Sequence, residues 1–490
     1  MAEVWTVAST SRHPDVPGSR QTAIRDVGKA ERRSDRVLIY VPSVLRDLEG
    51  HALVAYHLER LYGLQVCLAA LDDPEAHFFE FRPDVVVLDH LGWDSRVKLA
   101  RTARSLGVAV VVLSTAGFFQ DADLEANRAG KLLGAGGTAD RYLTWGESGR
   151  RVLLDHALFT AEQIAVVGSP RMDFYREPYL KLAPSRQDLL RGLGFVLPDL
   201  PLVVWTTNSY LGHATDIEQE VRAQASRAGR PLGEIRAEIE DCTEQVRNHS
   251  RLVTWLAARH SHWNFLIKVH PFESEEPYRE LASRAPNIRI TKQTPIRDVL
   301  VHADCLLQRG CTTGTEAWIL GKPVLELQIG RYQLPLDEAF MRGHEVVHDD
   351  AAAEDALVRF LGGEPVLPAK RRLREDLIEK LYGVVDGRAA ERAARVIYEL
   401  TQGQPRDGST RIALEHARTA WRFANSRRLP NRVKDLLGID RRLSLRFWKR
   451  FRKGRTSGQA ADPRLSIQAV DRLYDGFDRA FGGVLRSDAS

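Results

Sequence analysis

Short apolar runs that alternate with helical spacers restrict the fold of this chain more than any other feature. They recur in the first part at 36–42, 64–69, 84–89, 108–114, 142–147 and 164–168, and in the second part at 202–206, 265–269, 288–290 and 303–307. Runs of this length are typical of buried strands. Strands that alternate with helices form a parallel sheet covered on both faces. The sequence therefore predicts an α/β protein with two Rossmann-like domains.

Two proline-containing stretches, Glu177-Pro178 and Leu197–Pro201, interrupt this alternation and bracket a polar helix. Linkers between domains commonly have this composition. The first residues are polar and aperiodic, which predicts a disordered lead-in. The predicted parts are the lead-in at 1–35, an N-terminal Rossmann-like domain at 36–180, a C-terminal Rossmann-like domain at 195–385, a crossing helix at 386–403 and a basic helical extension at 404–490.

The stretch Val301–Leu327 joins a buried strand to a helix through a turn rich in glycine and hydroxyl groups. A strand, a tight turn and a helix N-terminus together present free backbone N–H groups to an anion. We interpret the stretch as a nucleotide phosphate site, and an ordinary αβ turn with threonine caps is the alternative. The candidate ligands are the hydroxyls of Thr312 and Thr313, the backbone at Gly314, and Glu316, which is placed to accept from a ribose.

An upstream strand, Phe265–Val269, ends on a His-Pro pair. Proline cannot continue the hydrogen-bond ladder, so His270 is expected at the carboxyl edge of the sheet, where open α/β folds bind ligands. Lys268 and Glu273 flank this histidine. A structural histidine is the alternative, but the phosphate site that follows at one βαβ spacing favours a functional role.

Two further turns carry candidate ligands. The strand at 202–206 runs into Thr207 and Asn208, whose side chains can donate to phosphate or sugar; simple turn chemistry is the alternative. The first strand of the chain runs into a turn with an arginine, two acids and a histidine: Arg46, Asp47, Glu49 and His51. A carboxylate there can take a proton from an attacking hydroxyl, whereas acids are also common in the first turn of any helix.

Two sequence elements, K-x-H-P-x-E at 268–273 and C-T-T-G-x-E-A-x-x-x-G-K-P at 311–323, together resemble the donor-site signature of GT-B glycosyltransferases that build bacterial surface polysaccharides. The group that the chain resembles is the surface carbohydrate biosynthesis protein family. That family is related to capsule Kdo- and sialyltransferases and to CDP-glycerol glycerophosphotransferases. The resemblance covers residues 36 to about 345 in scattered blocks.

The resemblance implies two domains that face each other across a cleft. It also implies transfer of a sugar, or a polyol phosphate, from a CMP-, CDP- or UDP-linked donor to a glycan or lipid-linked acceptor, without a metal or a cofactor. His270 and Lys268 would then stabilise the leaving nucleotide. The family has an Arg-acid-x-acid pattern, which Arg46, Asp47 and Glu49 match with Asp and Glu interchanged. The interchange leaves open which acid is the base, and we favour Glu49.

Two other functions remain open at this point. A non-hydrolysing nucleotide-sugar epimerase shares the two-domain fold, and a nucleotide-binding scaffold would bind the nucleotide without turnover. The acceptor-side carboxylates and the basic extension favour transfer over epimerisation, because an epimerase has no membrane acceptor to approach.

The segment Arg418–Arg455 is the most basic part of the chain. It contains 14 Lys and Arg residues against two acids, a charge of +12 in a chain whose net charge is only +5. Phe447, Trp448 and Phe451 add an aromatic stripe. A basic helix with such a stripe predicts binding to an anionic membrane surface. Nucleic-acid binding and packing against the protein itself are the alternatives, and no specific nucleic acid is expected.

The remaining composition bears on the compartment. The chain has no apolar run of about 18 residues, and its first residues lack the pattern of a signal peptide. Four cysteines without C-x-x-C spacing argue against a zinc site and fit a reducing compartment: Cys67, Cys242, Cys305 and Cys311. We therefore expect a cytoplasmic protein that associates peripherally with the inner face of the cytoplasmic membrane.

Overall fold

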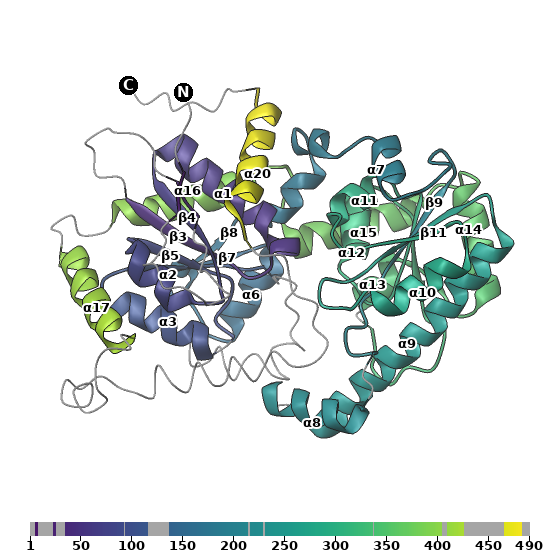
Figure 1. The fold of residues 1–490 in the computed structure, drawn as a ribbon, viewed down its shortest axis with the longest axis horizontal. Helices are drawn as coiled ribbons and strands as arrows, with labels where there is room; N and C mark the ends of the chain where they lie inside the picture. Colours follow the sequence, from purple (N-terminus) through teal and green to yellow (C-terminus); the bar gives the residue numbers. More distant parts are fainter. Residues whose placement is uncertain are drawn as a thin grey trace, which may run out of the picture. The chain divides into compact units, whose positions relative to one another are not determined.

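The computed structural model describes residues 5–7, 23–25, 35–92, 94–115, 137–213, 216–228, 231–336, 338–403, 409–425 and 465–482. The chain forms two compact units, each with its own sheet (Figure 1). Unit 1 contains the described residues up to Asp173 and those from Leu381 onward, and unit 2 contains Phe174–Lys380. The final helices of the chain thus belong to the unit that the first strands build.

The sheet of unit 1 has the strand order β1-β2-β4-β3-β5-β6-β7-β8. Its strands are β1 (Trp5–Val7), β2 (Ala23–Arg25), β3 (Arg36–Val41), β4 (Gln65–Ala70), β5 (Val85–Leu88), β6 (Ala109–Leu113), β7 (Arg141–Thr144) and β8 (Ile164–Val166). The strands from β4 to β8 in this order pair in parallel. Residues 37–40 of β3 are completely buried, as expected for a central strand covered on both faces.

Strands β1 and β2 differ from the expected disordered lead-in at 1–35. They pair with each other in antiparallel fashion, and β2 pairs in the same way with β4. A strand of three residues is too short to show the alternation by which a strand is recognised in a sequence. The other residues of the lead-in up to residue 34 lie outside the described residues.

Seven helices are described in unit 1. They are α1 (Val44–Tyr62), α2 (Pro74–Phe81), α3 (Asp94–Ser105), α6 (Glu147–Asp155), α16 (Ala389–Gln402), α17 (Ser409–Asn425) and α20 (Ile467–Ala480). The predicted crossing helix is α16, and it packs against α1 within unit 1. Alanines recur on its buried face, which lets the two helices approach closely. The carboxylate of Asp173 caps its first turn by accepting from the N–H groups of Ala389 and Ala390 at 2.9 and 2.8 Å.

The sheet of unit 2 has the order β11-β10-β9-β12-β13-β14, with all neighbours parallel. Its strands are β9 (Leu202–Thr206), β10 (Asn264–Lys268), β11 (Ile288–Thr291), β12 (Cys305–Gln308), β13 (Val324–Leu327) and β14 (Glu345–Val347). Numbered along the chain, this is the order 3-2-1-4-5-6 of a dinucleotide-binding sheet. The order reverses between β9 and β12, and such folds bind their ligands at this switch point.

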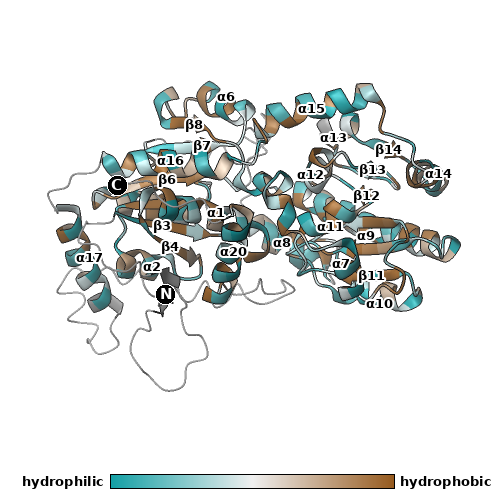
Figure 2. Ribbon diagram, turned by 90° about the horizontal axis from the view of Figure 1, so that it is seen from above, coloured by the Kyte–Doolittle hydropathy of each residue, from teal (hydrophilic) through white to brown (hydrophobic). Residues whose placement is uncertain are grey.

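The helices of this part of the chain are α7 (Arg186–Gly192), α8 (Ile217–Ala228), α9 (Leu232–Arg259), α10 (Glu276–Arg284), α11 (Ile296–His302), α12 (Thr313–Ile319), α13 (Glu338–Gly343), α14 (Asp350–Leu361) and α15 (Pro368–Tyr382). Those from α9 to α14 contact strands of the second sheet, and α8 packs against α9. Short 3-10 turns lie at 161–163, 170–175 and 179–182. Figure 2 shows the hydrophobic colour on the strands and a mixture of polar and apolar colour on the helices, as amphipathic packing requires.

The start of the basic segment packs on unit 1. In α17, Arg418 and Arg422 both donate to the carboxylate of Glu80 on α2, and the ring of Trp421 lies 5.7 Å from that of Phe79. The rest of the segment, 426–455, lies outside the described residues. Among the helices that the structure describes, none is long and apolar enough to cross a membrane.

Candidate functional site

Two turns meet at the switch point of unit 2, one after β9 and one after β12. The hydroxyls of Thr206 and Thr313 are hydrogen-bonded at 2.9 Å, and the side-chain amide of Asn208 donates to the carbonyl oxygen of Gly310 at 3.3 Å. The two bonds connect the turns on either side of the reversal in strand order. Sequence-predicted residues from distant segments are therefore brought together at one edge of the sheet.

The turn after β12 leaves a backbone donor available. Helix α12 begins at Thr313, and its N-cap Thr312 makes no side-chain capping bond. The N–H of Thr312 has no hydrogen-bond partner within the part of the chain that the structure describes, whereas the N–H of Thr313 interacts with the thiol of Cys311. Both side chains are only partly buried. One N–H group and two hydroxyls make this turn a candidate site for a phosphate oxygen.

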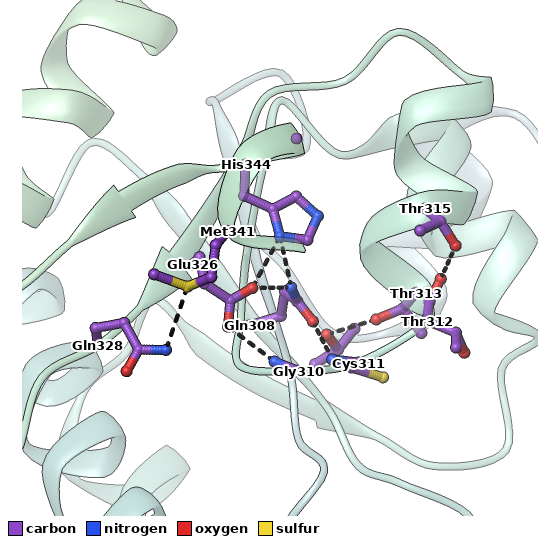
Figure 3. Close-up of polar contacts among 12 residues, drawn as sticks. Gln308, Gly310, Cys311, Thr312, Thr313, Thr315, Glu326, Gln328, Met341 and His344 are labelled. Atoms are coloured by element: carbon purple, nitrogen blue, oxygen red, sulfur yellow. Dashed lines mark hydrogen bonds and ion pairs between the residues drawn. The ribbon is translucent and has the colours of Figure 1, made fainter. Parts of the chain in front are cut away.

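A buried network lies beneath the turn (Figure 3). One carboxylate oxygen of Glu326 accepts from the N–H of Gly310 at 2.8 Å, and the other lies within hydrogen-bond distance of Gln308 Nε2 and, at 2.8 Å, of His344 Nδ1. Gln308 in turn accepts from the N–H of Cys311 at 2.6 Å. Side chains from β12, β13 and the start of β14 thus fix the backbone of the phosphate turn.

The Glu326–His344 pair in this network is neutral near pH 7. Burial raises the pKa of Glu326 to about 8. Burial, together with nearby Arg374 and Lys370, holds the pKa of His344 well below its ordinary value. The carboxylic acid therefore donates to the unprotonated Nδ1 of the imidazole, and no net charge is buried.

The sequence predicted the phosphate turn but not the buried network beneath it. The available signal was a glutamate inside the apolar run 323–327, because an acid in a buried strand needs a partner. The network also explains Gly314. A Cβ added at this position would lie 2.5 Å from Nε2 of His344, so only glycine fits without a shift of the histidine.

His270 stands at the end of the next strand, β10. The backbone N–H of Phe272 donates to its Nδ1 at 3.2 Å, and its own N–H donates to the hydroxyl of Thr207 at 2.9 Å. In the neutral ring the proton is therefore on Nε2. The ring is half-buried, with the rings of Tyr210 and Phe272 at 6.3 and 5.4 Å. Thr207 is buried and positions this loop.

Lys268 and Glu273 support the same loop from inside. The ammonium of Lys268 donates to the carbonyl oxygen of Lys292 at 2.7 Å, and that of Lys292 donates to the carbonyl oxygen of Glu273 at 2.8 Å. Burial, and then the positive charge of Lys292, lower the pKa of Lys268 to about 8. Both predicted donor ligands are thus buried within the protein, and their contacts there are structural.

The carboxylate of Glu273 is fully engaged. It accepts from the N–H of Ser209 at 2.6 Å and from the hydroxyl of Tyr278 at 2.5 Å, with His213 at 3.8 Å. Burial alone would raise the pKa of Glu273, but the nearby His213 and the hydrogen bonds from Tyr278 and Ser209 outweigh it and leave the pKa below its ordinary value. This carboxylate therefore joins the loop after β9 to the loop after β10.

Glu316, predicted to bind a ribose, is only 1% exposed. Its carboxylate accepts a short hydrogen bond from the hydroxyl of Tyr175, which also belongs to unit 2. A ribose would have to compete with this tyrosine for the carboxylate.

In unit 1 the candidate residues lie at the start of α1. The guanidinium of Arg46 donates two hydrogen bonds of 2.9 Å to the two carboxylate oxygens of Asp47. His51, one turn later, is 4% exposed, and its Nδ1 lies 2.7 Å from the carbonyl oxygen of Asp47. Glu49 lies two residues from both Asp47 and His51, so it is on another face of the helix.

Asp47 and His51 line a small cavity at the carboxyl edge of the first sheet. Its other walls come from the helix α1 and from the ends of β6, β7 and β8: Gly50, Leu113, Ser114, Thr115, Trp145, Ser169, Pro170 and Arg171. The cavity measures about 20 Å³, which is room for one water molecule or one hydroxyl group. Glu49 is not among its lining residues.

The four cysteines are buried and unpaired. Within the described residues, His, Cys, Asp and Glu side chains form no group of three or more that is arranged to hold a metal ion.

No protein-family model matches the chain, and no curated protein matches it. Solved structures do match. The S. aureus MnaA–UDP structure is 14% identical, covers 76% of this chain and 99% of its own, and has a TM-score of 0.50. The UDP-GlcNAc 2-epimerase from Neisseria meningitidis, bound to UDP-GlcNAc, is 14% identical, with coverages of 75% and 100% and a TM-score of 0.48. The wall teichoic acid polymerase TagF is 10% identical, with coverages of 75% and 89% and a TM-score of 0.46.

At such low identities the likeness concerns the fold. The chain is an α/β protein with two Rossmann-like domains of the GT-B type, followed by helices of a C-terminal region. The fold predicted from the alternation of strands and helices is confirmed.

Proposed function

We propose that the chain is a GT-B transferase of surface polysaccharide biosynthesis. It would move a sugar, or a polyol phosphate, from a nucleotide-activated donor to a glycan or lipid-linked acceptor. The observation that carries the proposal is the switch point of unit 2. There the N–H of Thr312 lacks a partner among the described residues, while His270 stands at the same edge of the sheet.

The geometry supports different roles for the turn at Thr312 and for His270. β10 and β12 are both neighbours of β9, so the loops that carry His270 and Thr312 are separated by one strand at the same edge of the sheet. The turn at Thr312 would hold one phosphate group of the donor. Nε2 of His270 would donate to the oxygen that gains charge as the nucleotide leaves, a type of interaction that is strongest in the transition state.

The roles of the remaining predicted residues follow from their burial. Asn208 is half-buried and can reach a ligand beside Gly310. Lys268, Glu273 and Thr207 would act by holding the loops in place. The ribose role of Glu316 stays a prediction, because the carboxylate would have to exchange Tyr175 for the ligand. On the acceptor side, Arg46, Asp47, Glu49 and His51 are the candidates.

A non-hydrolysing nucleotide-sugar epimerase is the second candidate, because the same two-domain fold serves that reaction and MnaA, which shares the fold, was solved with UDP. An epimerase needs no acceptor and returns its product still linked to the nucleotide. A nucleotide-binding scaffold would bind without any turnover. Net release of nucleotide is expected of a transferase, but not of an epimerase or of a scaffold.

The decisive experiment incubates the purified full-length chain with CMP-, CDP- and UDP-linked donors, and measures released nucleotide with and without a bacterial lipid extract. Acceptor-dependent release is the expected result. Interconversion of UDP-GlcNAc and its 2-epimer without release would favour the epimerase. Calorimetry with free nucleotides gives the second readout. We expect pyrimidine nucleotides to bind more tightly than purine nucleotides, and Glu316→Ala to weaken that binding.

Peripheral attachment to the inner face of the cytoplasmic membrane belongs to the same proposal. Two of the 14 basic residues of Arg418–Arg455, Arg418 and Arg422, already pair with Glu80. Attachment would therefore depend on the 12 basic residues at 427–455, each worth about 1 kcal/mol close to an anionic surface. Cosedimentation with anionic vesicles that decreases as salt rises is the expected result, and tight binding of duplex DNA instead would contradict it.

A further inference from the structure

The cavity at the carboxyl edge of unit 1 contains polar atoms that the protein leaves without partners. Nε2 of His51 and Oγ of Ser114 are both buried, and neither has a hydrogen-bond partner among the described residues. Both side chains line the cavity of about 20 Å³. Buried polar atoms are normally satisfied, so a cavity with two such atoms and the size of one hydroxyl group fits a polar ligand group.

The hydrogen bond at the other ring nitrogen decides the chemistry of His51. Nδ1 lies 2.7 Å from the carbonyl oxygen of Asp47. A carbonyl oxygen only accepts, so Nδ1 carries a proton and donates it. In the neutral imidazole, Nε2 then has a lone pair. The lone pair is thus on the nitrogen that lacks a partner, which is the arrangement of a proton acceptor.

The two carboxylates expected to be the base are less well placed. Asp47 is buried, and both of its oxygens accept from the guanidinium of Arg46. This bidentate pairing occupies both oxygens with a charged donor of the protein itself. Glu49 is on another face of α1 and does not line the cavity. The charged groups that line the cavity beside His51 are Asp47, paired with Arg46, and Arg171 from the turn after β8.

We propose that the cavity of unit 1 receives the acceptor hydroxyl and that His51 is the general base of the transfer, with the carbonyl oxygen of Asp47 holding its tautomer. The inference rests on the proposed function. The O–H bond of the acceptor breaks and its proton goes to Nε2. The oxygen forms the new bond to the sugar carbon or to phosphorus. The bond to the nucleotide phosphate oxygen breaks and its electron pair leaves with the nucleotide. The imidazolium then releases its proton to water.

The test compares His51→Gln with His57→Gln in the full-length chain. His57 is a matched control, because it is on the same helix and buried but does not line the cavity. Nucleotide release is measured as a function of pH with CMP-, CDP- and UDP-linked donors and a bacterial lipid extract. We expect His51→Gln to lower kcat about 100-fold or more, as loss of a general base does, with an unchanged Kd for the free nucleotide. His57→Gln should retain wild-type turnover.

The pH profile and chemical rescue separate catalysis from positioning. Wild-type turnover should decline at acid pH as one group is protonated, and this limb should disappear from the residual activity of His51→Gln. Added imidazole should restore turnover to His51→Ala and leave Glu49→Ala unaffected. Retained turnover in a folded His51→Gln, or a larger loss in Glu49→Ala, overturns the inference.

A second variant keeps the proposal testable if substitutions at His51 prevent folding. Ser114→Val places a methyl group in the cavity, and should raise KM for the acceptor while the Kd for free nucleotide stays unchanged. An unchanged KM overturns the inference. The absence of nucleotide release from the wild type with every donor would overturn the proposed function and the inference together. Release from the wild type that is unchanged in the His51→Gln and Ser114→Val variants would overturn the inference alone.

Discussion

The carboxyl edges of the two sheets differ in how their polar groups are bonded. Beneath the phosphate turn of unit 2, Gln308, Glu326 and Nδ1 of His344 bond to one another and to the turn's backbone. At the edge of unit 1, His51 and Ser114 are buried without such partners in the described chain. Polar groups that bond to one another stabilise the fold. Polar groups left unmatched contribute little stability, but they can bind a ligand.

This difference predicts whether a substitution at each edge should change stability or activity. Removal of a member of the unit 2 network leaves several buried groups unsatisfied, which costs stability. Removal of an unmatched group in unit 1 leaves no new unsatisfied group, so its effect should appear in activity.

Glu326→Ala should have the largest effect on stability. It leaves the N–H of Gly310 without its acceptor and removes the carboxyl group bonded to Gln308 Nε2 and His344 Nδ1, which keep only their mutual contact of 3.1 Å. At about 1–3 kcal/mol for each buried unsatisfied group, the loss should be about 3 kcal/mol or more. Denaturant unfolding measures the loss in the free energy of unfolding. Faster hydrogen exchange in α12 would show that the loss of stability lies at the phosphate turn. Glu326→Gln, which keeps an acceptor and a donor, should lose less; equal losses would show that the network is not the cause.

His270→Ala should change activity and not stability. The ring is half-buried, and its Nδ1 accepts from the nearby N–H of Phe272. Loss of a transition-state donor should lower turnover about 100-fold or more, which corresponds to about 2.7 kcal/mol. His262→Ala, at an exposed histidine of the same unit, is the control. A folded His270→Ala enzyme with full turnover would remove the histidine from the mechanism.

The stability of unit 2 should decrease as pH rises through the range set by Glu326. Its pKa is raised by burial from 4.5 to about 8, so the native state keeps a proton that the unfolded state has lost. The contribution is complete below about pH 4.5 and is lost as pH approaches about 8, with a slope of at most about 1.4 kcal/mol per pH unit. Glu326→Gln should remove this slope. If the stability of the variant and of the wild type changed with pH in the same way, the slope would not come from Glu326.

Ser114→Ala should have the smallest effect on stability. Its hydroxyl is buried without a partner in the described chain, so its removal should change the free energy of unfolding by no more than about 0.5 kcal/mol. Thermal unfolding checks this value. A loss of more than about 1 kcal/mol would mean that the hydroxyl makes a hydrogen bond, and the contrast between the two edges would then be weaker.

The sequence by itself determined the fold class and the positions of the candidate turns. Alternating strand and helix patterns are local, and so are the strand ends at Thr207, His270 and Thr312. In a parallel sheet these ends fall at one edge whatever the details of packing. The sequence thus located His270, Asn208, Thr312 and Thr313, the predicted donor-site residues that the structure leaves partly accessible.

Only the tertiary structure decided which polar side chains are available to a ligand. Tyr175 and Glu316 are 141 residues apart in the chain, and Gln308 and His344 are 36 apart. Their pairing is set by how the helices and strands pack, which no local pattern encodes. The same holds for His51, which the sequence placed beside two acids. The ion pair of Asp47 with Arg46 and the packing of four elements around the cavity leave Nε2 of His51 as a buried ring nitrogen without a partner among the described residues.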